Sequence, residues 1–137
     1  MVLLFDQYHL PKDVFEVIFA TEQQAAVGRM LISDMKEKGG EMGKTEMSVF
    51  ATLLHEGTEI TFEEKGPMGT VKLKKEKISY NKRQFYDRIL TPMKAMGLID
   101  YDLYRKKYMI SDRFNKALVK IGLMWIQELQ RGPPIMK

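Results

Sequence analysis

Polar and basic side chains gather at the start of one predicted helix in the second half of the chain. Asn81, Gln84 and Arg88 have i, i+3, i+7 spacing, which places them on one side of the first two helical turns. Asn and Gln can form paired hydrogen bonds with adenine, and Arg with guanine. We therefore predict that Gln84 and Arg88 contact base edges, while Lys82 and Arg83 contact phosphates. The alternative is that all five side chains are ordinary solvated residues.

A pair of short strands, predicted at 98–103 and 107–111, follows this helix. Gly97 allows the chain to reverse after the helix without a Cβ clash. We expect Leu98 and Ile110 to anchor the base of the strand pair in the core. The turn between the strands then remains exposed, and its charge suits a phosphate or minor-groove contact. Its basic residues are Arg105, Lys106 and Lys107.

The segment 81–115 resembles the corresponding part of winged helix–turn–helix proteins. In MarR-like and related bacterial and archaeal regulators a helix ends at Gly-Leu-Ile, and the returning strand reads Tyr-x-Leu/Ile-Ser/Thr. Here these motifs are Gly97-Leu98-Ile99 and Tyr108-Met109-Ile110-Ser111. The resemblance implies a winged-helix domain over 1–111, with a recognition helix at 81–96 and a wing at 98–111. It also implies double-stranded DNA as the partner.

The preceding elements must position that helix. Residues 13–20 are predicted to form a short helix, and a second helix is expected to begin at a Thr21 capping box and end at Gly39-Gly40. Thr45 is the predicted N-cap of a third helix, which Gly57 ends. The recognition helix itself is predicted to begin at a Ser79 or Asn81 cap and to bury one stripe, which contains Phe85, Ile89, Met93 and Met96, widened by Tyr86 and Leu90.

Two features depart from the winged-helix pattern. Residues 57–78 read as an inserted β-hairpin, where the family usually has a tight turn. Pro92 lies inside the predicted recognition helix, where it removes one backbone hydrogen bond and should kink or tighten the last turn. The insertion has three possible uses: an added hairpin only, a second basic arm, or a surface for a partner.

A final helix, predicted over 112–131 with Ser111 or Asp112 as its cap, is apolar on more than one side. A second copy of the chain would cover this excess, so we predict a homodimer through this helix. The alternative is burial within one chain, against the apolar N-terminus and the first helix. The predicted interface consists of Phe114, Leu118, Ile121, Trp125 and Leu129.

Composition and charge fit this assignment. The chain has 137 residues and no Cys, which excludes disulfides and thiolate metal sites. Residues 1–64 hold 5 Lys/Arg and 12 Asp/Glu, whereas residues 65–137 hold 17 Lys/Arg and 6 Asp/Glu. This asymmetry favours a polyanionic partner for the second half. No apolar run is long enough for a membrane span or a secretory signal, so we expect a cytoplasmic protein.

No motif for catalysis is evident. Gly43-Lys44-Thr45 imitates the end of a P-loop, but position 38 is Lys instead of Gly. His9 and His55 have no metal-ligand spacing, and Glu63-Glu64-Lys65 lacks the further carboxylates of a nuclease site. We therefore predict a protein that is not an enzyme and has no cofactor or metal. A small-molecule effector, bound between the last helix and the core, remains possible.

The sequence thus favours an α+β protein, mainly α with a small β-wing. We expect sequence-specific double-stranded DNA binding by a dimeric transcriptional regulator. Two alternatives fit the same length and charge. One is a winged-helix module that binds another protein, and the other is an architectural protein that binds DNA without sequence preference.

Overall fold

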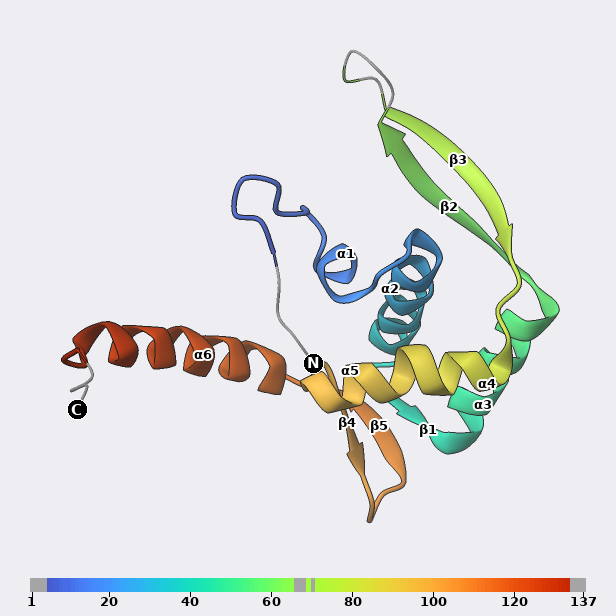
Figure 1. Cartoon of the computed structure of the whole chain (residues 1–137). Coiled ribbons are helices and arrows are strands. Elements are labelled where there is room, and N and C mark those ends of the chain that lie inside the picture. The colour runs from blue at the N-terminus through green and yellow to red at the C-terminus, as the bar shows by residue number, and fades with distance from the viewer. Residues whose placement is uncertain (1–4, 66–68, 70, 134–137) are drawn as a thin grey trace.

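The computed structural model describes residues 5–65, 69 and 71–133, with the backbone alone at 58–65 and 71–76. Over these residues the chain is mainly helical, with a three-stranded antiparallel sheet and a separate two-stranded hairpin (Figure 1). This confirms the predicted α+β class. The elements are α1 (Val14–Ile18), α2 (Glu22–Glu37), β1 (Glu41–Gly43), α3 (Lys44–Glu56), β2 (Thr58–Lys65), β3 (Val71–Ile78), α4 (Lys82–Phe85), the π-helical turn η2 (Tyr86–Leu90), α5 (Thr91–Met96), β4 (Ile99–Asp102), β5 (Lys107–Ile110) and α6 (Arg113–Gln130).

The core lies where α2, α3, the broken helix α4–η2–α5 and the three-stranded sheet meet. The predicted stripe of the broken helix is confirmed at its centre, because Phe85, Ile89 and Met93 are completely buried. The Phe85 ring packs 5.4 Å from the ring of Phe50 on α3, measured between centroids. Tyr86 packs against the edge of this core. The opposite side of the helix is therefore left to polar residues.

The sheet has the strand order β1-β5-β4, in which β5 pairs with both neighbours in antiparallel register. The strand β1 was not predicted. Its three residues follow Gly39 and Gly40 and carry no periodic pattern of their own. They become a strand because the backbone of residues 41–43 pairs with residues 107–109 of β5, far away in sequence.

The predicted helix caps are confirmed in part. The hydroxyl of Thr21 accepts a hydrogen bond from the backbone of Gln24, as the capping box predicts. The prediction of Thr45 as a cap is wrong, because α3 begins at Lys44 and its N-cap is Gly43. The carboxylate of Glu46 accepts a hydrogen bond from the Gly43 backbone, which ties down the same helix end.

The base of the β4–β5 hairpin is anchored differently from the prediction. Ile99 is 1% exposed, while Ile110, directly opposite it in register, is 38% exposed. Leu98 is partly buried against the core. The second anchor is Tyr108, whose ring meets that of Tyr101 at 4.7 Å between centroids. The pair of Tyr101 and Tyr108 thus anchors the hairpin to the core, a role that we predicted for Ile110.

Two elements extend away from the body. The hairpin β2–β3 leaves on the side opposite the β4–β5 turn, and α6 extends outward as a single helix (Figure 1). The pairing of β2 with β3 confirms the predicted inserted hairpin, although its turn at 66–70 lies largely outside the described residues. Ile78 at the base of this hairpin is buried, and the backbone N–H of Tyr80 donates to the carbonyl of Leu54. The hairpin therefore starts from a fixed base.

Gly97 lies between α5 and β4 and is in close contact with the start of α6. It has φ +87° after α5, and an added Cβ would lie 2.9 Å from both the Cβ of Arg113 and the backbone nitrogen of Phe114. Gly39 has a similar φ of +79° but nothing within 4 Å. We expect Gly39→Ala to lower the free energy of unfolding by about 1 kcal/mol from backbone strain. Gly97→Ala should cost about 2 kcal/mol more, because the start of α6 must move. Urea denaturation of both variants measures the difference, and equal losses would contradict the close approach.

Candidate nucleic-acid interface

Asn81 organises the start of the broken helix. Its side-chain oxygen accepts hydrogen bonds from the backbone N–H groups of Arg83 at 2.9 Å and Gln84 at 3.3 Å. This confirms Asn81 as the N-cap. Because the oxygen is already used, Asn81 cannot form the paired hydrogen bonds with adenine that its residue type suggests. Its amide N–H groups remain available as donors toward a phosphate or a base.

The remaining predicted contact residues of this helix are exposed. Lys82, Arg83, Gln84 and Arg88 all lie outside the core, on elements whose other side is completely buried. The ammonium group of Lys82 donates a hydrogen bond to the hydroxyl of Ser48 on α3, at 3.1 Å. Within the described part of the chain, the side chains of Gln84 and Arg88 have no hydrogen-bond or ion-pair partner. They are therefore available to a ligand.

Pro92 acts differently from the prediction. The turn before it, η2, is widened to a π-helix instead of tightened, and the backbone N–H of Thr91 donates to the carbonyl of Tyr86, five residues earlier. Pro92 cannot donate to Arg88, and its ring would clash with that carbonyl in a regular α-helix. The wider turn removes this conflict. Arg88 lies within the π-turn, so its direction relative to Gln84 differs from that on a continuous α-helix.

The β4–β5 turn is less basic than its sequence suggests. The carboxylate of Glu41 on β1 lies 2.9 Å from the guanidinium of Arg105 and 3.6 Å from the ammonium of Lys107. Lys106 has no such partner among the described residues and adopts a left-handed backbone, with φ 53°. The carboxylate of Asp102 caps the turn by accepting from two backbone N–H groups. Of the three predicted basic contacts, Lys106 alone carries an unneutralised charge.

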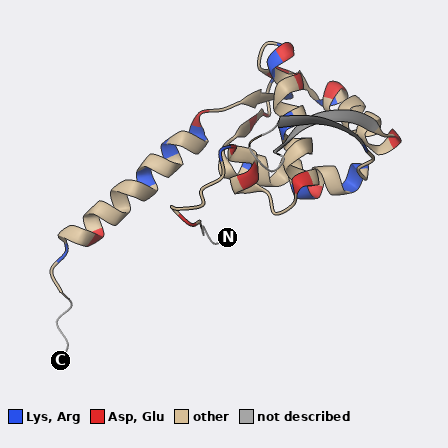
Figure 2. Cartoon of the chain, turned by 90° about the horizontal axis from the view of Figure 1, so that it is seen from above, with Lys and Arg blue, Asp and Glu red and all other residues tan. Residues whose placement is uncertain are grey.

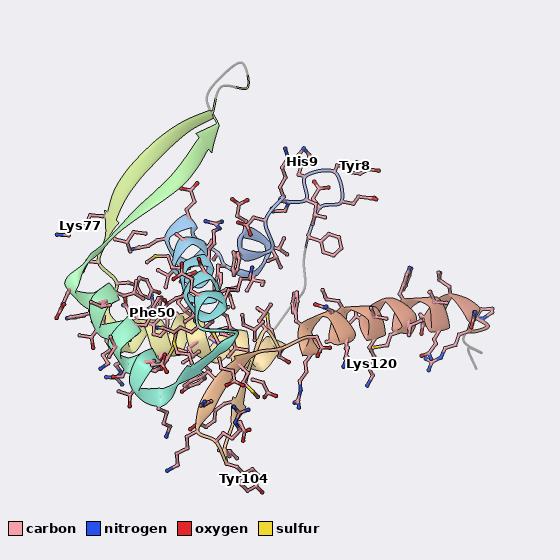
Figure 3. The ribbon with its side chains drawn as sticks, turned by 180° about the vertical axis from the view of Figure 1, so that it is seen from behind. Tyr8, His9, Phe50, Lys77, Tyr104 and Lys120 are labelled. Carbon is pink, nitrogen blue, oxygen red and sulfur yellow. The ribbon has the colours of Figure 1, made fainter. Side chains whose placement is uncertain are left out.

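An aromatic residue that sequence analysis did not select stands at the end of this turn. Tyr104 is 99% exposed and points away from the body (Figure 3). Leu103 beside it is also exposed. Exposed aromatic side chains of this kind are common at contact surfaces, because they offer apolar area together with a polar hydroxyl. An aromatic residue within a charged turn is visible in the sequence and could have identified Tyr104.

The helix α6 has no buried residue. Phe114 at its start is partly buried, and the other four predicted interface residues, Leu118, Ile121, Trp125 and Leu129, are exposed. Charged residues are few along the helix, and most of its length carries no charge (Figure 2). Packing against α1 within the same chain does not occur among the described residues, and residues 1–4 lie outside them. Among the described residues, nothing therefore covers the apolar surface of α6.

A cavity of about 640 Å³ lies between α2 and α3. Its lining includes the apolar residues Met30, Val49 and Phe50 and the charged residues Arg29 and Glu37. The cavity has no lining residue from α6, so it is not the expected effector site between the last helix and the core. An effector remains a prediction without a defined site.

Other candidate chemistry is limited. Within the described ranges, no group of three or more His, Asp or Glu side chains is arranged to hold a metal ion. The ring of His9 contacts the carboxylate of Asp6 at 2.6 Å on an exposed loop before α1 (Figure 3). That hydrogen bond is the main cause that lowers the pKa of Asp6 below its usual value. No helix in the described segments is both long and apolar enough to cross a membrane.

Comparison with known proteins gives no match. No protein-family model fits the chain, and neither a curated protein nor a solved structure is significantly similar to it. The interpretation of this surface therefore depends on its own geometry.

The role of Asn81 as a cap can be tested separately from any ligand. Asn81→Ala should lower the free energy of unfolding by about 1 kcal/mol, because two backbone N–H groups lose their acceptor. Asn81→Asp should retain most of the stability, since Asp is an equally good N-cap. Asn115→Ala, at an exposed position of α6, is the matched control. Urea denaturation measures all three, and equal stability of the Ala and Asp variants at 81 would contradict the capping role.

Proposed function

We propose that this protein is a winged helix–turn–helix protein that binds double-stranded DNA with sequence preference, as a homodimer, and regulates transcription. The order of elements supports this proposal. In the winged-helix arrangement, two helices and a recognition helix precede the two strands of the wing. Here α2, α3, the broken helix α4–η2–α5, β4 and β5 follow that order, with the hairpin β2–β3 inserted before the broken helix.

The observation that carries the proposal is the division of the broken helix into two sides. One side is fixed in the core by Phe85, Ile89 and Met93, while Gln84 and Arg88 on the other side have no partner within the described residues. An α-helix with its side chains is about as wide as the DNA major groove. Recognition helices contact bases mainly from their N-terminal residues, which is where these two side chains lie.

The other predicted contacts take supporting roles in this proposal. Asn81, Lys82 and Arg83 lie at the start of the helix, where their donors and charges suit the DNA backbone. Lys106 is the main backbone contact of the wing. Arg105 and Lys107 contribute less, because Glu41 already neutralises part of their charge.

Dimerisation through α6 follows from its uncovered apolar surface. Trp125 is 63% exposed and Leu129 is 65% exposed, values that are unusual for large apolar side chains repeated along one helix. A two-fold dimer buries the same surface on both copies. It would also present two recognition helices to half-sites about one DNA turn apart.

Selection of bound sequences from a randomised duplex pool tests the function. We expect an enriched motif with two inverted halves. Arg88→Ala should then lower affinity for the selected duplex by about 1–3 kcal/mol and relax the preference, because it removes a base contact. Lys106→Ala should weaken binding to all duplexes alike and reduce the slope of log affinity against log salt concentration by about one.

Other outcomes would change the proposal. Binding without enrichment would identify an architectural protein. Absence of binding would leave a protein-interaction module as the remaining assignment. An equal loss on every duplex from Arg88→Ala would show that Arg88 contacts only the backbone.

The dimer is tested with neighbouring residues of α6. Ile121→Glu places a charge in the apolar stripe, and we expect the mass measured by light scattering to fall from two chains to one. Lys120→Glu introduces the same residue at the adjacent position and should leave the dimer intact. A dimeric Ile121→Glu variant would exclude this stripe as the interface, and a monomeric unaltered protein would exclude the dimer.

A further inference from the structure

Two lysines that the sequence analysis did not select are held against tyrosine rings between the broken helix and the sheet. The ammonium group of Lys94 on α5 lies 5.5 Å from the ring centre of Tyr101 and 5.8 Å from that of Tyr108. The ammonium group of Lys44, the first residue of α3, lies 5.8 Å from the same Tyr101 ring. Helix α3 and the later elements α5, β4 and β5 thus bring two cations to one aromatic pair.

Neither of these two cations is neutralised by a described acidic side chain, in contrast to three other lysines of the chain. Lys38, Lys107 and Lys116 each have a carboxylate within 4.0 Å. Among the described residues, no carboxylate lies within that distance of Lys44 or Lys94. A tyrosine ring attracts an ammonium group and limits its motion, but leaves its full charge. The two like charges near one ring also repel each other, and an anion that contacts both would offset that repulsion.

The groups around the pair are suited to an anion. Burial, followed by the neighbouring Tyr86 and Tyr101, raises the pKa of the Tyr108 hydroxyl above its usual value. The Tyr108 hydroxyl is therefore neutral and protonated at physiological pH. A protonated hydroxyl can donate a hydrogen bond to an oxyanion.

The location connects the pair to the proposed DNA surface. Lys44 and Ser48 are one turn apart on α3, and Ser48 accepts the hydrogen bond from Lys82 of α4. The surface therefore continues from the start of the recognition helix, across α3, to the end of α5 beside the wing. A phosphate at this position would belong to the DNA backbone between the base contacts and the wing contact.

We propose that Lys44 and Lys94, positioned by the rings of Tyr101 and Tyr108, bind one phosphate group of the DNA backbone. This inference depends on the proposed function, and it adds two binding residues that contribute affinity without sequence preference. Lysine is well suited to this role, because it binds phosphate as a compact charge.

Fluorescence polarisation with labelled duplexes, repeated over a range of salt concentrations, tests the proposal. Lys94→Gln and Lys44→Gln should each weaken binding about three- to tenfold, on the selected duplex and on a random one alike, and each should reduce the salt slope by about one. Lys94→Arg, which keeps the charge, should retain most of the affinity. Lys36→Gln, an exposed lysine of α2, is the control for loss of one charge.

A second variant separates the binding role from a structural one. Tyr101→Leu removes the ring that holds both ammonium groups while both charges remain, and we expect weaker binding with an unchanged circular dichroism spectrum. Lys94→Gln and Lys44→Gln variants that bind like Lys36→Gln would overturn the inference and leave the proposed function intact. Failure of the unaltered protein to bind any duplex would overturn both.

Discussion

The complete burial of Phe85, Ile89 and Met93 fixes the orientation of the broken helix, and most of the candidate surface depends on it. Three fully buried side chains along one side leave the helix no freedom to rotate about its axis, because rotation would expose apolar area and open cavities. The Phe50–Phe85 contact ties the same side to α3. Gln84 and Arg88 face solvent as a consequence of that packing. The surface is thus determined by residues that do not belong to it.

Local patterns in the sequence predicted part of this arrangement. The buried stripe, the Asn81 cap and the inserted hairpin all follow from residues close together in the sequence, where periodicity, cap residues and turn residues are visible. The strand β1 and the neutralisation of Arg105 by Glu41 were not predictable in this way. Glu41 and Arg105 are 64 residues apart, and only the pairing of β1 with β5 brings them together.

The π-turn illustrates a different limit of sequence reasoning. Pro92 is evident in the sequence, and the loss of its hydrogen bond was predicted correctly. Whether the helix bends, tightens or widens depends on what holds it on both sides. Here Phe85 and Met93 are fixed in the core before and after the proline, so the helix keeps its axis and accommodates one wide turn between them. The same fixed positions place Lys94 beside the sheet.

The exposed helix α6 has a consequence for how the chain folds. Tertiary contacts of α6 are made at its start, where Arg113 pairs with Asp100 and the backbone of Phe114 donates to Gly97. None of its 18 residues is buried, and such a helix is only marginally stable in water, since most helical stability in proteins comes from packing. In a dilute solution of separate chains, this segment would exchange between helix and coil while the body stays folded. Its order would rise with protein concentration as copies associate. Folding of the last segment and assembly would then be a single, concentration-dependent equilibrium.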